Sequence, residues 1–333
     1  MRTFLNKIGA LLLAALLATA ALPGGAHAAA KSRKEKKKSE APAPEKKLSA
    51  YEKLFKDKES RTAEGLFKLH IIDGKLYTEI PLDILEREFV INTTIEASSL
   101  ADYGLAGQQP LPPYHITFSR RDSLVRMHEV PRRTLSDSDA GIARALELSS
   151  TMPIVASYPI KAYNADSTAV VIENTALFMS DNEHLKAFEA RGMSPLHISR
   201  ASYKADRSLL RDVEGGKDYA SVISDMTYGV TTQYFIFIIC KDKPFTARAR
   251  RTVTILPEEC APARIADPRI GVLPVPFTRF TAEQGTRPAY FASRINFRPG
   301  GEIHPVTFYI DTLFTPAWQR GIRRGIALWN EAF

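Results

Sequence analysis

The chain has 333 residues, 44% of them hydrophobic, and a formal net charge of +8 at pH 7. This charge is not spread over the chain, because residues 1–30 carry two of the surplus positive charges, residues 31–60 carry five and the remaining 273 residues carry one. A nucleic-acid-binding domain concentrates positive charge on a folded face, so this distribution argues against a nucleic-acid partner.

Residues 1–28 have the three parts of a secretory signal peptide. Arg2 and Lys7 give the positive start, an apolar core follows, and Ala26-His27-Ala28 forms a small-residue cleavage site. The core is shorter than the ~20 residues of a spanning helix, and no later run is apolar enough to span a membrane. We therefore expect Sec-type export to the periplasm, the outer surface or the extracellular space, with no transmembrane segment.

Residues 29–48 are rich in Lys, Glu, Ala and Pro and have almost nothing to bury, which predicts a disordered tether. Residues 49–97 are predicted to form a small unit. Tyr51–Arg61 favours a short charged helix. The β-rich runs 65–72 and 75–80, joined by Asp73-Gly74, form the strongest short hairpin signal. Phe89–Ala97 alternates as a further strand.

Residues 98–300 are predicted to be a β-rich domain. Ser136–Ser149 favours a helix that Ser136 or Ser138 could cap, and Asp181–Arg191 favours a short polar helix. The remaining pattern is a series of strands separated by turn residues. We therefore predict a mainly β, α+β fold with antiparallel, hairpin-rich sheets, sandwich-like packing and few helices. The strands are expected over 116–120, 124–129, 154–163, 168–173, 219–228, 233–240, 248–256, 270–280 and 290–297.

The two cysteines, Cys240 and Cys260, could pair in an oxidising compartment. A hairpin of residues 232–240 with 247–256 over Lys241–Thr246 would place Cys240 opposite Ala247, far in register from Cys260. The pairing is left open by the sequence.

Catalytic chemistry is not visible in the sequence. A zinc site on a helix needs His-Glu-x-x-His, but the single His-Glu pair, His128-Glu129, lacks the second histidine, and Pro131 follows it. The other histidines of the mature chain are scattered without ligand spacing. We therefore assign no catalytic residue, no metal ligand and no cofactor to this chain.

Asp267-Pro268-Arg269, within Ala266–Gly271, forms the most distinctive loop. Pro268 biases Asp267 away from helical angles. One interpretation is an Asp267–Arg269 ion pair that pins a crossover between strands. The other is an extended segment that meets a neighbouring domain.

Residues 301–333 read as a strand, Val306–Ile310, followed by an amphipathic helix. Thr315 can cap that helix and Pro316 fits its first turn. One apolar stripe should require burial, and we expect this segment to open a domain whose remainder is absent. The stripe consists of Trp318, Ile322, Ile326, Trp329 and Phe333.

In their order along the chain, four segments resemble a known family. They are Gly65–Ile80, Ile154–Asn164 with its Pro159-Ile160-Lys161-Ala162-Tyr163-Asn164, the Ala266–Gly271 loop and Val306–Phe333. The family is the large secreted bacterial zinc-dependent metalloproteases, whose N-terminal regions are domains of unknown function. The resemblance implies that 301–333 begins an incomplete α/β metzincin-like catalytic domain. The His-Glu-x-x-His-x-x-Gly-x-x-His motif, and therefore the zinc, is expected only in the part of that domain that is absent here.

The leading hypothesis is a non-catalytic N-terminal region of such a hydrolase, assisting folding, latency or substrate engagement. Its partners would be the downstream catalytic domain and a protein substrate. Cys260 and Asp267 are candidates for a latency ligand, since a thiolate or carboxylate suits zinc, and Arg269 joins Asp267 as an interdomain candidate. The rival hypothesis is a stand-alone exported β-rich module that binds protein or glycan at the cell envelope.

Overall fold

The computed structural model describes residues 48–131, 134–136, 140–190, 194–258, 262–295 and 305–332. The chain divides into two units, residues 1–47 and residues 48–333, and the second unit is the one described below. The predicted signal peptide, the predicted tether except Leu48, and Cys260 lie outside the described residues.

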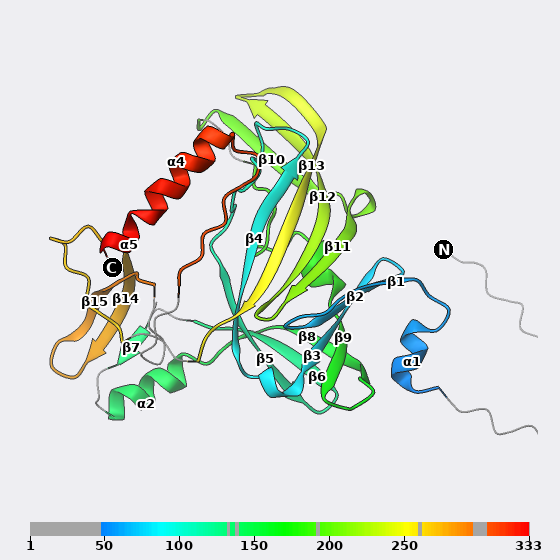
Figure 1. Ribbon diagram of the computed structural model, residues 1–333, viewed down its shortest axis with the longest axis horizontal. Helices are drawn as coiled ribbons and strands as arrows, with labels where there is room; N and C mark the ends of the chain where they lie inside the picture. Colours follow the sequence, from blue (N-terminus) through cyan, green and yellow to red (C-terminus); the bar gives the residue numbers. More distant parts are fainter. Residues whose placement is uncertain are drawn as a thin grey trace, which may run out of the picture. The chain divides into compact units, whose positions relative to one another are not determined.

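Strands dominate the described residues (Figure 1). The first nine are β1 (Ser60–Ala63), β2 (Lys68–Ile72), β3 (Lys75–Pro81), β4 (Glu88–Ser98), β5 (Tyr114–Arg121), β6 (Leu124–Glu129), β7 (Thr134–Ser136), β8 (Ile154–Tyr163) and β9 (Ala169–Glu173). The others are β10 (His197–Tyr203), β11 (Leu209–Gly216), β12 (Tyr219–Tyr234), β13 (Phe237–Ile255), β14 (Pro274–Thr281) and β15 (Gly285–Ala292).

Helices are short and few in the described part of the chain. None of them is long and apolar enough to cross a membrane. They are α1 (Ala50–Phe55), α2 (Ala140–Ser149), α3 (Thr175–Met179), α4 (Pro316–Ala327) and α5 (Trp329–Ala332), with two 3₁₀ turns, η1 (Leu82–Ile84) and η2 (Ala205–Arg207).

One large sheet contains 12 of the described strands, in the order β1-β2-β3-β9-β8-β6-β5-β4-β13-β12-β10, with β11 also paired to β12. All its neighbouring strands run antiparallel. A smaller sheet has the order β15-β14-β7, and β14 runs parallel to β7. The predicted fold class, mainly β with antiparallel hairpins and few helices, is confirmed. The large sheet also crosses the predicted division between residues 97 and 98, because β4 pairs with both β13 and β5.

The large sheet folds over so that β11 lies against β1 and β2. The backbone N–H of Leu66 donates to the carbonyl of Gly216 at 2.7 Å. This approach requires glycine, since a Cβ at Gly65 would lie 2.5 Å from the backbone nitrogen of Gly216. The two facing layers enclose the main apolar core, to which Leu76, Phe89 and Ile172 contribute completely buried side chains.

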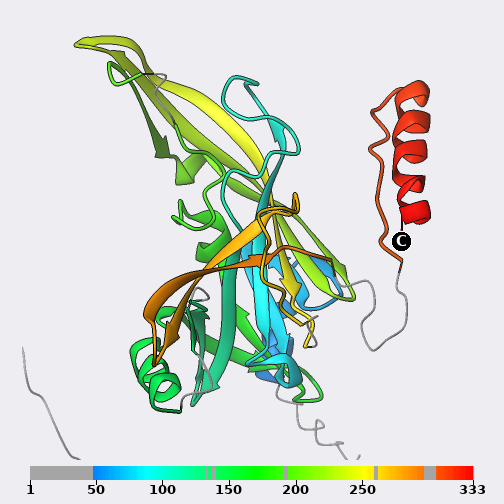
Figure 2. The ribbon, with the colours of Figure 1, turned by 90° about the vertical axis from the view of Figure 1, so that its left-hand side faces the viewer.

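A second core lies at the other end of the long strands β12 and β13. It contains Met226, Tyr228, Val230 and Phe245, covered by Phe188 from the loop after α3. Beyond these residues the β12–β13 hairpin continues past the end of β4, while β10 accompanies β12 as far as Tyr234 (Figures 1 and 2).

Arg251 of β13 is 0% exposed and links the loop after α3 to the sheet by hydrogen bonds. Its guanidinium donates to the carbonyls of Leu185 (2.8 and 3.1 Å) and Phe178 (2.6 Å), and to the Ser224 hydroxyl (3.1 Å). Burial lowers the pKa of Arg251 to about 10. The predicted helix Asp181–Arg191 is therefore wrong over its described residues: the segment is a loop, because its Leu185 carbonyl bonds Arg251 and its apolar side chains enter the core.

The predicted hairpins are confirmed in three places. Residues 68–72 and 75–81 pair across Asp73-Gly74, both with positive φ, as the two-residue turn requires. β5 pairs with β6 around Asp122, and β8 pairs with β9 across the predicted turn 164–167.

The turn predicted at Lys241–Thr246 is wrong. The chain reverses at Phe235 and Ile236, and Cys240 lies opposite Thr232 instead of Ala247. The charged run with Pro244 has the composition of a loop, but β13 passes through it. There Pro244 faces Gly229, and the positive φ of Asp242 lies in the strand next to a register irregularity.

Two helix predictions need correction at their ends. The helix predicted over Tyr51–Arg61 ends at Phe55, because residues 60–63 pair with β2 as β1. The helix predicted from Ser136 is helical from Ala140, since Ser136 belongs to β7 and pairs with Phe280. The other predicted cap, Ser138, lies outside the described residues.

The C-terminal helix is confirmed as α4, with Thr315 at the N-cap and Pro316 in the first turn, although the Thr315 side chain makes no capping hydrogen bond. The strand predicted over Val306–Ile310 is wrong. Residues 305–310 are extended without a ladder partner in the described part of the chain, and a strand exists only where a second backbone accepts its hydrogen bonds.

Candidate functional site

Asp267 and Arg269, the candidates from the sequence, form an ion pair with each other. Asp267 Oδ1 accepts hydrogen bonds from Nε and from the backbone N–H of Arg269, both at 2.9 Å, and Oδ2 accepts from Nη2 at 2.5 Å. The predicted pair therefore exists. It joins residues two apart in one loop, however, so it shapes the loop and does not bridge two strands.

The charge of Arg269 holds the pKa of Asp267 below its ordinary value of 3.8 through these hydrogen bonds. The carboxylate is thus ionised at neutral pH, the state that a metal ligand needs. Both of its oxygens are already occupied, so ligation of a metal would require Arg269 to leave. The Arg269 side chain is 86% exposed, which leaves it open to a second body.

The loop containing this pair runs along β15. The backbone N–H of Ala266 donates to the carbonyl of Tyr290, and that of Ala292 donates to Arg264, both at 2.8 Å. Ile265, Ile270 and Leu273 in the same stretch are exposed, and Leu273 reaches 79%. The third candidate, Cys260, lies outside the described residues, and Cys240 has a free thiol.

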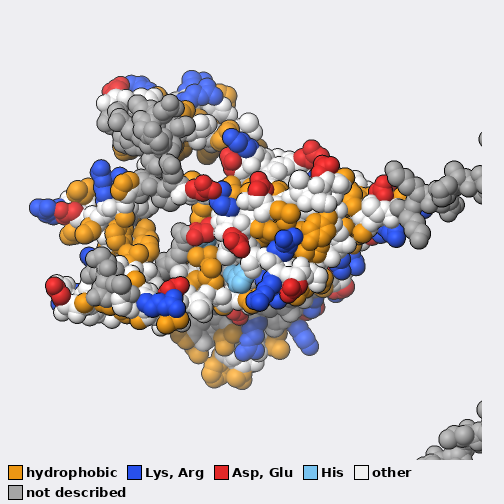
Figure 3. All heavy atoms as spheres, turned by 90° about the horizontal axis from the view of Figure 1, so that it is seen from below, with side chains coloured by type: hydrophobic (Ala, Val, Ile, Leu, Met, Phe, Trp, Pro, Cys, Tyr) orange, Lys and Arg blue, Asp and Glu red, His pale blue; other side chains and the backbone are white. Residues whose placement is uncertain are grey.

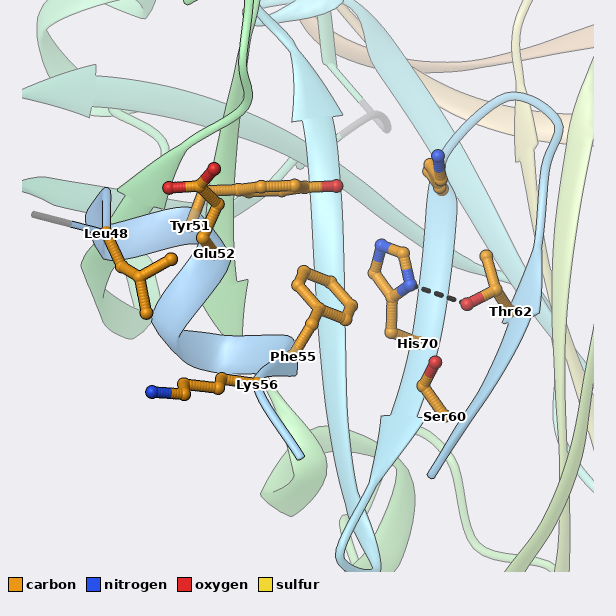
Figure 4. Close-up of a pocket in the computed structure, with 9 residues that line it drawn as sticks. Leu48, Tyr51, Glu52, Phe55, Lys56, Ser60, Thr62 and His70 are labelled. Atoms are coloured by element: carbon orange, nitrogen blue, oxygen red, sulfur yellow. Dashed lines mark hydrogen bonds between the residues drawn. The ribbon is translucent and has the colours of Figure 1, made fainter. Parts of the chain in front are cut away.

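A polar cluster that the sequence did not single out lies beside α1, and Figure 4 shows three of its members, Tyr51, Thr62 and His70. His70 Nε2 lies 2.8 Å from Glu79 Oε1, and His70 Nδ1 lies 2.8 Å from the Thr62 hydroxyl. The Tyr51 hydroxyl of α1 donates to the same oxygen of Glu79 at 2.5 Å. We call Tyr51, Thr62, His70 and Glu79 the α1 cluster.

Within the α1 cluster, the electrostatic surroundings favour the ionised form of the Glu79 carboxylate. Burial opposes ionisation there, but the hydrogen bonds from His70 and Tyr51 outweigh it and lower the pKa of Glu79. Burial, followed by the bond to Glu79, raises the pKa of Tyr51. The phenol is therefore a donor throughout the physiological range, and it ties α1 to β3.

A pocket of about 500 Å³ opens beside this cluster and is lined by Tyr51, Phe55, Thr62 and His70 among others. The Phe55 ring meets the His70 ring edge-on, with centroids 4.7 Å apart. The hydroxyl–imidazole–carboxylate order is that of an activated nucleophile. Its carboxylate, however, is shared with Tyr51 and its ring is covered by Phe55, so this arrangement anchors α1 to the sheet.

The sequence contained a signal for the α1 cluster. Once the Asp73-Gly74 turn fixes the register, His70 pairs with Tyr77 and Lys68 pairs with Glu79. His70 and Glu79 are then diagonal neighbours on one face of the hairpin, within reach of long side chains. The contributions of Tyr51 and Thr62 depend on the position of α1 and β1, which the local pattern does not give.

Two further hollows lie elsewhere on the unit. One, of about 680 Å³, brings together His115, Glu129 and His184; burial lowers the pKa of His115, and the His184 ring stacks on Tyr114 with centroids 4.1 Å apart. The other, of about 820 Å³, lies next to the second core and reaches Ile239 and Lys243. Among the described residues, no group of three or more His, Cys, Asp or Glu side chains is placed to hold a metal ion.

Comparison with known proteins gives two family matches. Residues 111–299, more than half of the chain, match a family described as "Domain of unknown function (DUF5117)". Residues 48–98 match a second family, "Domain of unknown function (DUF5118)". No curated protein and no solved structure matches the chain.

Proposed function

The chain belongs to the family described as Domain of unknown function (DUF5117), and from that premise we propose that it is a non-catalytic accessory region of a secreted zinc-dependent metallopeptidase. In this proposal residues 262–295 pack against the peptidase domain, and residues 301–333 form the first segment of that domain. The body then assists the folding, latency or substrate engagement of that domain.

The observation that carries the proposal is the apolar surface of residues 262–332. Among the described residues, every completely or nearly buried apolar side chain lies at or before Val253. After that point the large apolar side chains are exposed or only half-buried, and Trp318 and Trp329 reach 67% and 63% exposure. Exposure of many large apolar side chains is typical of a region that another body covers.

The placement of charge supports the same interpretation. On α4 the arginines Arg320, Arg323 and Arg324 are exposed, while Ile322 and Ile326 are half-buried. Hydrophobic side chains also lie open between charged patches on the face seen in Figure 3. An interface core of tryptophan and aliphatic side chains with an arginine rim is the usual composition of a stable protein contact.

The geometry of Asp267 favours an interdomain role over a zinc-ligand role. Its two oxygens are held by Arg269, whereas Arg269 and the neighbouring Leu273 are exposed. We therefore place this loop at the interface with the peptidase domain. The zinc would be held by that domain's own histidines, and no step through zinc is assigned to residues of this chain.

Reading the source gene beyond codon 333 and expressing its complete product tests the proposal. We expect an in-frame His-Glu-x-x-His, bound zinc and cleavage of a peptide substrate. The double variant Leu273→Glu with Trp318→Glu should then lower the yield of folded, active protein, whereas the matched variant Leu148→Glu on α2 should not.

Two results would contradict the proposal. Stoichiometric zinc with turnover by the 333-residue chain alone would make the chain itself the enzyme. A natural stop codon after Phe333, with no peptidase that binds the chain, would favour the rival stand-alone binding module.

A further inference from the structure

The end of the β12–β13 hairpin is a run of six apolar residues, Tyr-Phe-Ile-Phe-Ile-Ile, at positions 234–239. We call it the apolar tip. Each of its side chains is exposed, with exposed fractions between 49% and 71%. The second core ends before it, at Val230 and Phe245. The hairpin extends past the end of β4 (Figures 1 and 2), whereas β10 begins beside the tip, where His197 pairs with Tyr234.

Both faces of the hairpin are apolar at the tip. Successive side chains of a strand point to opposite faces, so an interface with a protein partner on one face calls for alternating apolar and polar residues. Here Phe237 and Ile238 are successive strand residues and so belong to opposite faces, and both are exposed. Tyr234 pairs with Phe237 and shares its face. A medium that surrounds the hairpin on both faces fits this pattern better than a single protein surface.

The turn at the end of the hairpin holds an aromatic residue in an unfavourable backbone conformation. Phe235 has a φ of 51°, a left-handed conformation in which bulky residues are uncommon and glycine or asparagine is normal in a hairpin turn. A large apolar residue at such a position points to a use for that side chain.

A collar of positive charge lies just behind the tip. Residues 196–204 of the β10 segment and 230–243 of the hairpin contain four basic residues and one acidic residue, a surplus of three. The acidic residue, Asp242, is held by Lys204 at 2.9 Å. The other basic residues are Arg200, Lys241 and Lys243.

We propose that the apolar tip inserts into the interfacial region of a lipid bilayer whose headgroups are anionic. The apolar side chains enter the boundary between headgroups and acyl chains. Tyr234, at the base of the tip, keeps its hydroxyl at headgroup level, as interfacial tyrosines do. The basic collar then lies against the anionic surface, within the distance at which salt does not screen it. This inference is independent of the proposed peptidase partner.

A fluorescent label on the tip tests the insertion directly. In the full chain carrying Cys240→Ser and Cys260→Ser, Ile236→Cys is labelled with an environment-sensitive nitrobenzoxadiazole group. Vesicles of phosphatidylcholine with 30% phosphatidylglycerol should shift its emission to the blue, and doxyl-labelled lipid should quench it. A label at Leu148→Cys on α2 is the matched control and should do neither. Because the readout is local, attachment of residues 1–48 to the vesicle does not imitate it.

The charge collar gives the second measurement. Lys241→Gln and Lys243→Gln should each raise the lipid concentration needed for half of the blue shift by about fivefold. Vesicles of phosphatidylcholine alone should give a much weaker shift. Circular dichroism and thermal melting of each variant confirm that these exposed substitutions leave the fold intact.

Three outcomes would overturn the inference. The tip label could remain in an aqueous environment with anionic vesicles present. Its response could be equal with neutral and anionic vesicles. The unlabelled chain could form dimers without lipid that Ile236→Asp with Phe237→Asp converts to monomers, which would make the tip a contact between two copies.

Discussion

Residues 48–258 and residues 262–332 differ in where their large apolar side chains lie. The first region folds a 12-stranded sheet over two cores, whereas the described part of the second contributes no side chain to either core. Both regions contain β-hairpins with well-formed ladders, since β14 and β15 pair over eight positions. The two regions therefore differ in the burial of their large apolar side chains and not in the presence of hydrogen-bonded secondary structure.

This difference has an energetic consequence. Hydrogen bonds contribute little net free energy once exchanged for bonds to water, and a hairpin whose apolar side chains are not buried against a core is marginal in water. We expect the first region to account for nearly all of the cooperative free energy of unfolding. The second region should gain stability only when its apolar surface is covered.

The largest expected difference in the free energy of unfolding is between substitutions of two arginines, one in each region. Arg251→Met should reduce the free energy of unfolding by about 4 kcal/mol, because the carbonyls of Phe178 and Leu185 would lose their buried donors. Arg269→Met should leave the urea midpoint unchanged, since that side chain is 86% exposed. Urea titration followed by circular dichroism measures both, and equal shifts would remove the distinction between the regions.

Two leucines test the same comparison without charge. Leu76→Ala should cost about 3 kcal/mol, because this completely buried side chain would leave a cavity in the main core. Leu273→Ala should change the free energy of unfolding by less than about 0.5 kcal/mol. A large loss from Leu273→Ala would mean that residues 262–295 share the cooperative core after all.

Most of the first region follows from its local pattern. The Asp73-Gly74 turn and the alternation of Phe89–Ala97 predict β2, β3 and β4 because turn chemistry and side-chain period are local properties. The reversal at Phe235 could not be predicted in this way, since a phenylalanine carries no turn signal, whereas Lys241–Thr246 with Pro244 carries a strong one. There, the long pairing of β12 with β13 decides the register.

The loop after α3 and the α1 cluster also depend on contacts between residues far apart in the chain, which the local pattern does not predict. Asp181–Arg191 has the composition of a polar helix, but Arg251, more than 60 residues later, donates two hydrogen bonds to its Leu185 carbonyl. His70 and Glu79 are neighbours by register, whereas the bond from Tyr51 depends on where α1 lies. The Asp267–Arg269 pair was predictable because both partners lie in one loop.

The α1 cluster predicts a smaller, pH-dependent effect. Tyr51→Phe should cost about 1 kcal/mol at pH 7, because the ionised Glu79 would lose a hydrogen-bond donor. The pKa of Glu79 is lowered by folding. Its stabilisation is therefore present above the ordinary pKa of 4.5 and is lost as the pH falls through the folded value.

The cost of Tyr51→Phe should shrink accordingly in acid, and urea titrations at pH 7 and pH 3 measure the change. Tyr163→Phe is the control, since its hydroxyl accepts only a long, exposed bond from Arg120 at 3.3 Å. A cost for Tyr51→Phe that does not vary with pH would mean that the Tyr51 hydroxyl does not act through the Glu79 charge.

The smallest effect is expected at Asp267. In the 333-residue chain, Asp267→Asn should leave the urea midpoint at pH 7 unchanged, as should the control Asp206→Asn, which removes an exposed pair from the first region. Folding lowers the pKa of Asp267, so whatever the pair contributes is present above pH 3.8 and lost as the pH falls through the folded value.

The Asp267→Asn and Asp206→Asn variants should differ in stability once residues 262–332 are covered. Exclusion of water strengthens the interaction between charges. If the proposed peptidase domain covers this region, Asp267→Asn should therefore destabilise the complete protein while Asp206→Asn still does not. If the two variants remained alike in the complete protein, the Asp267 loop would not lie at the proposed interface.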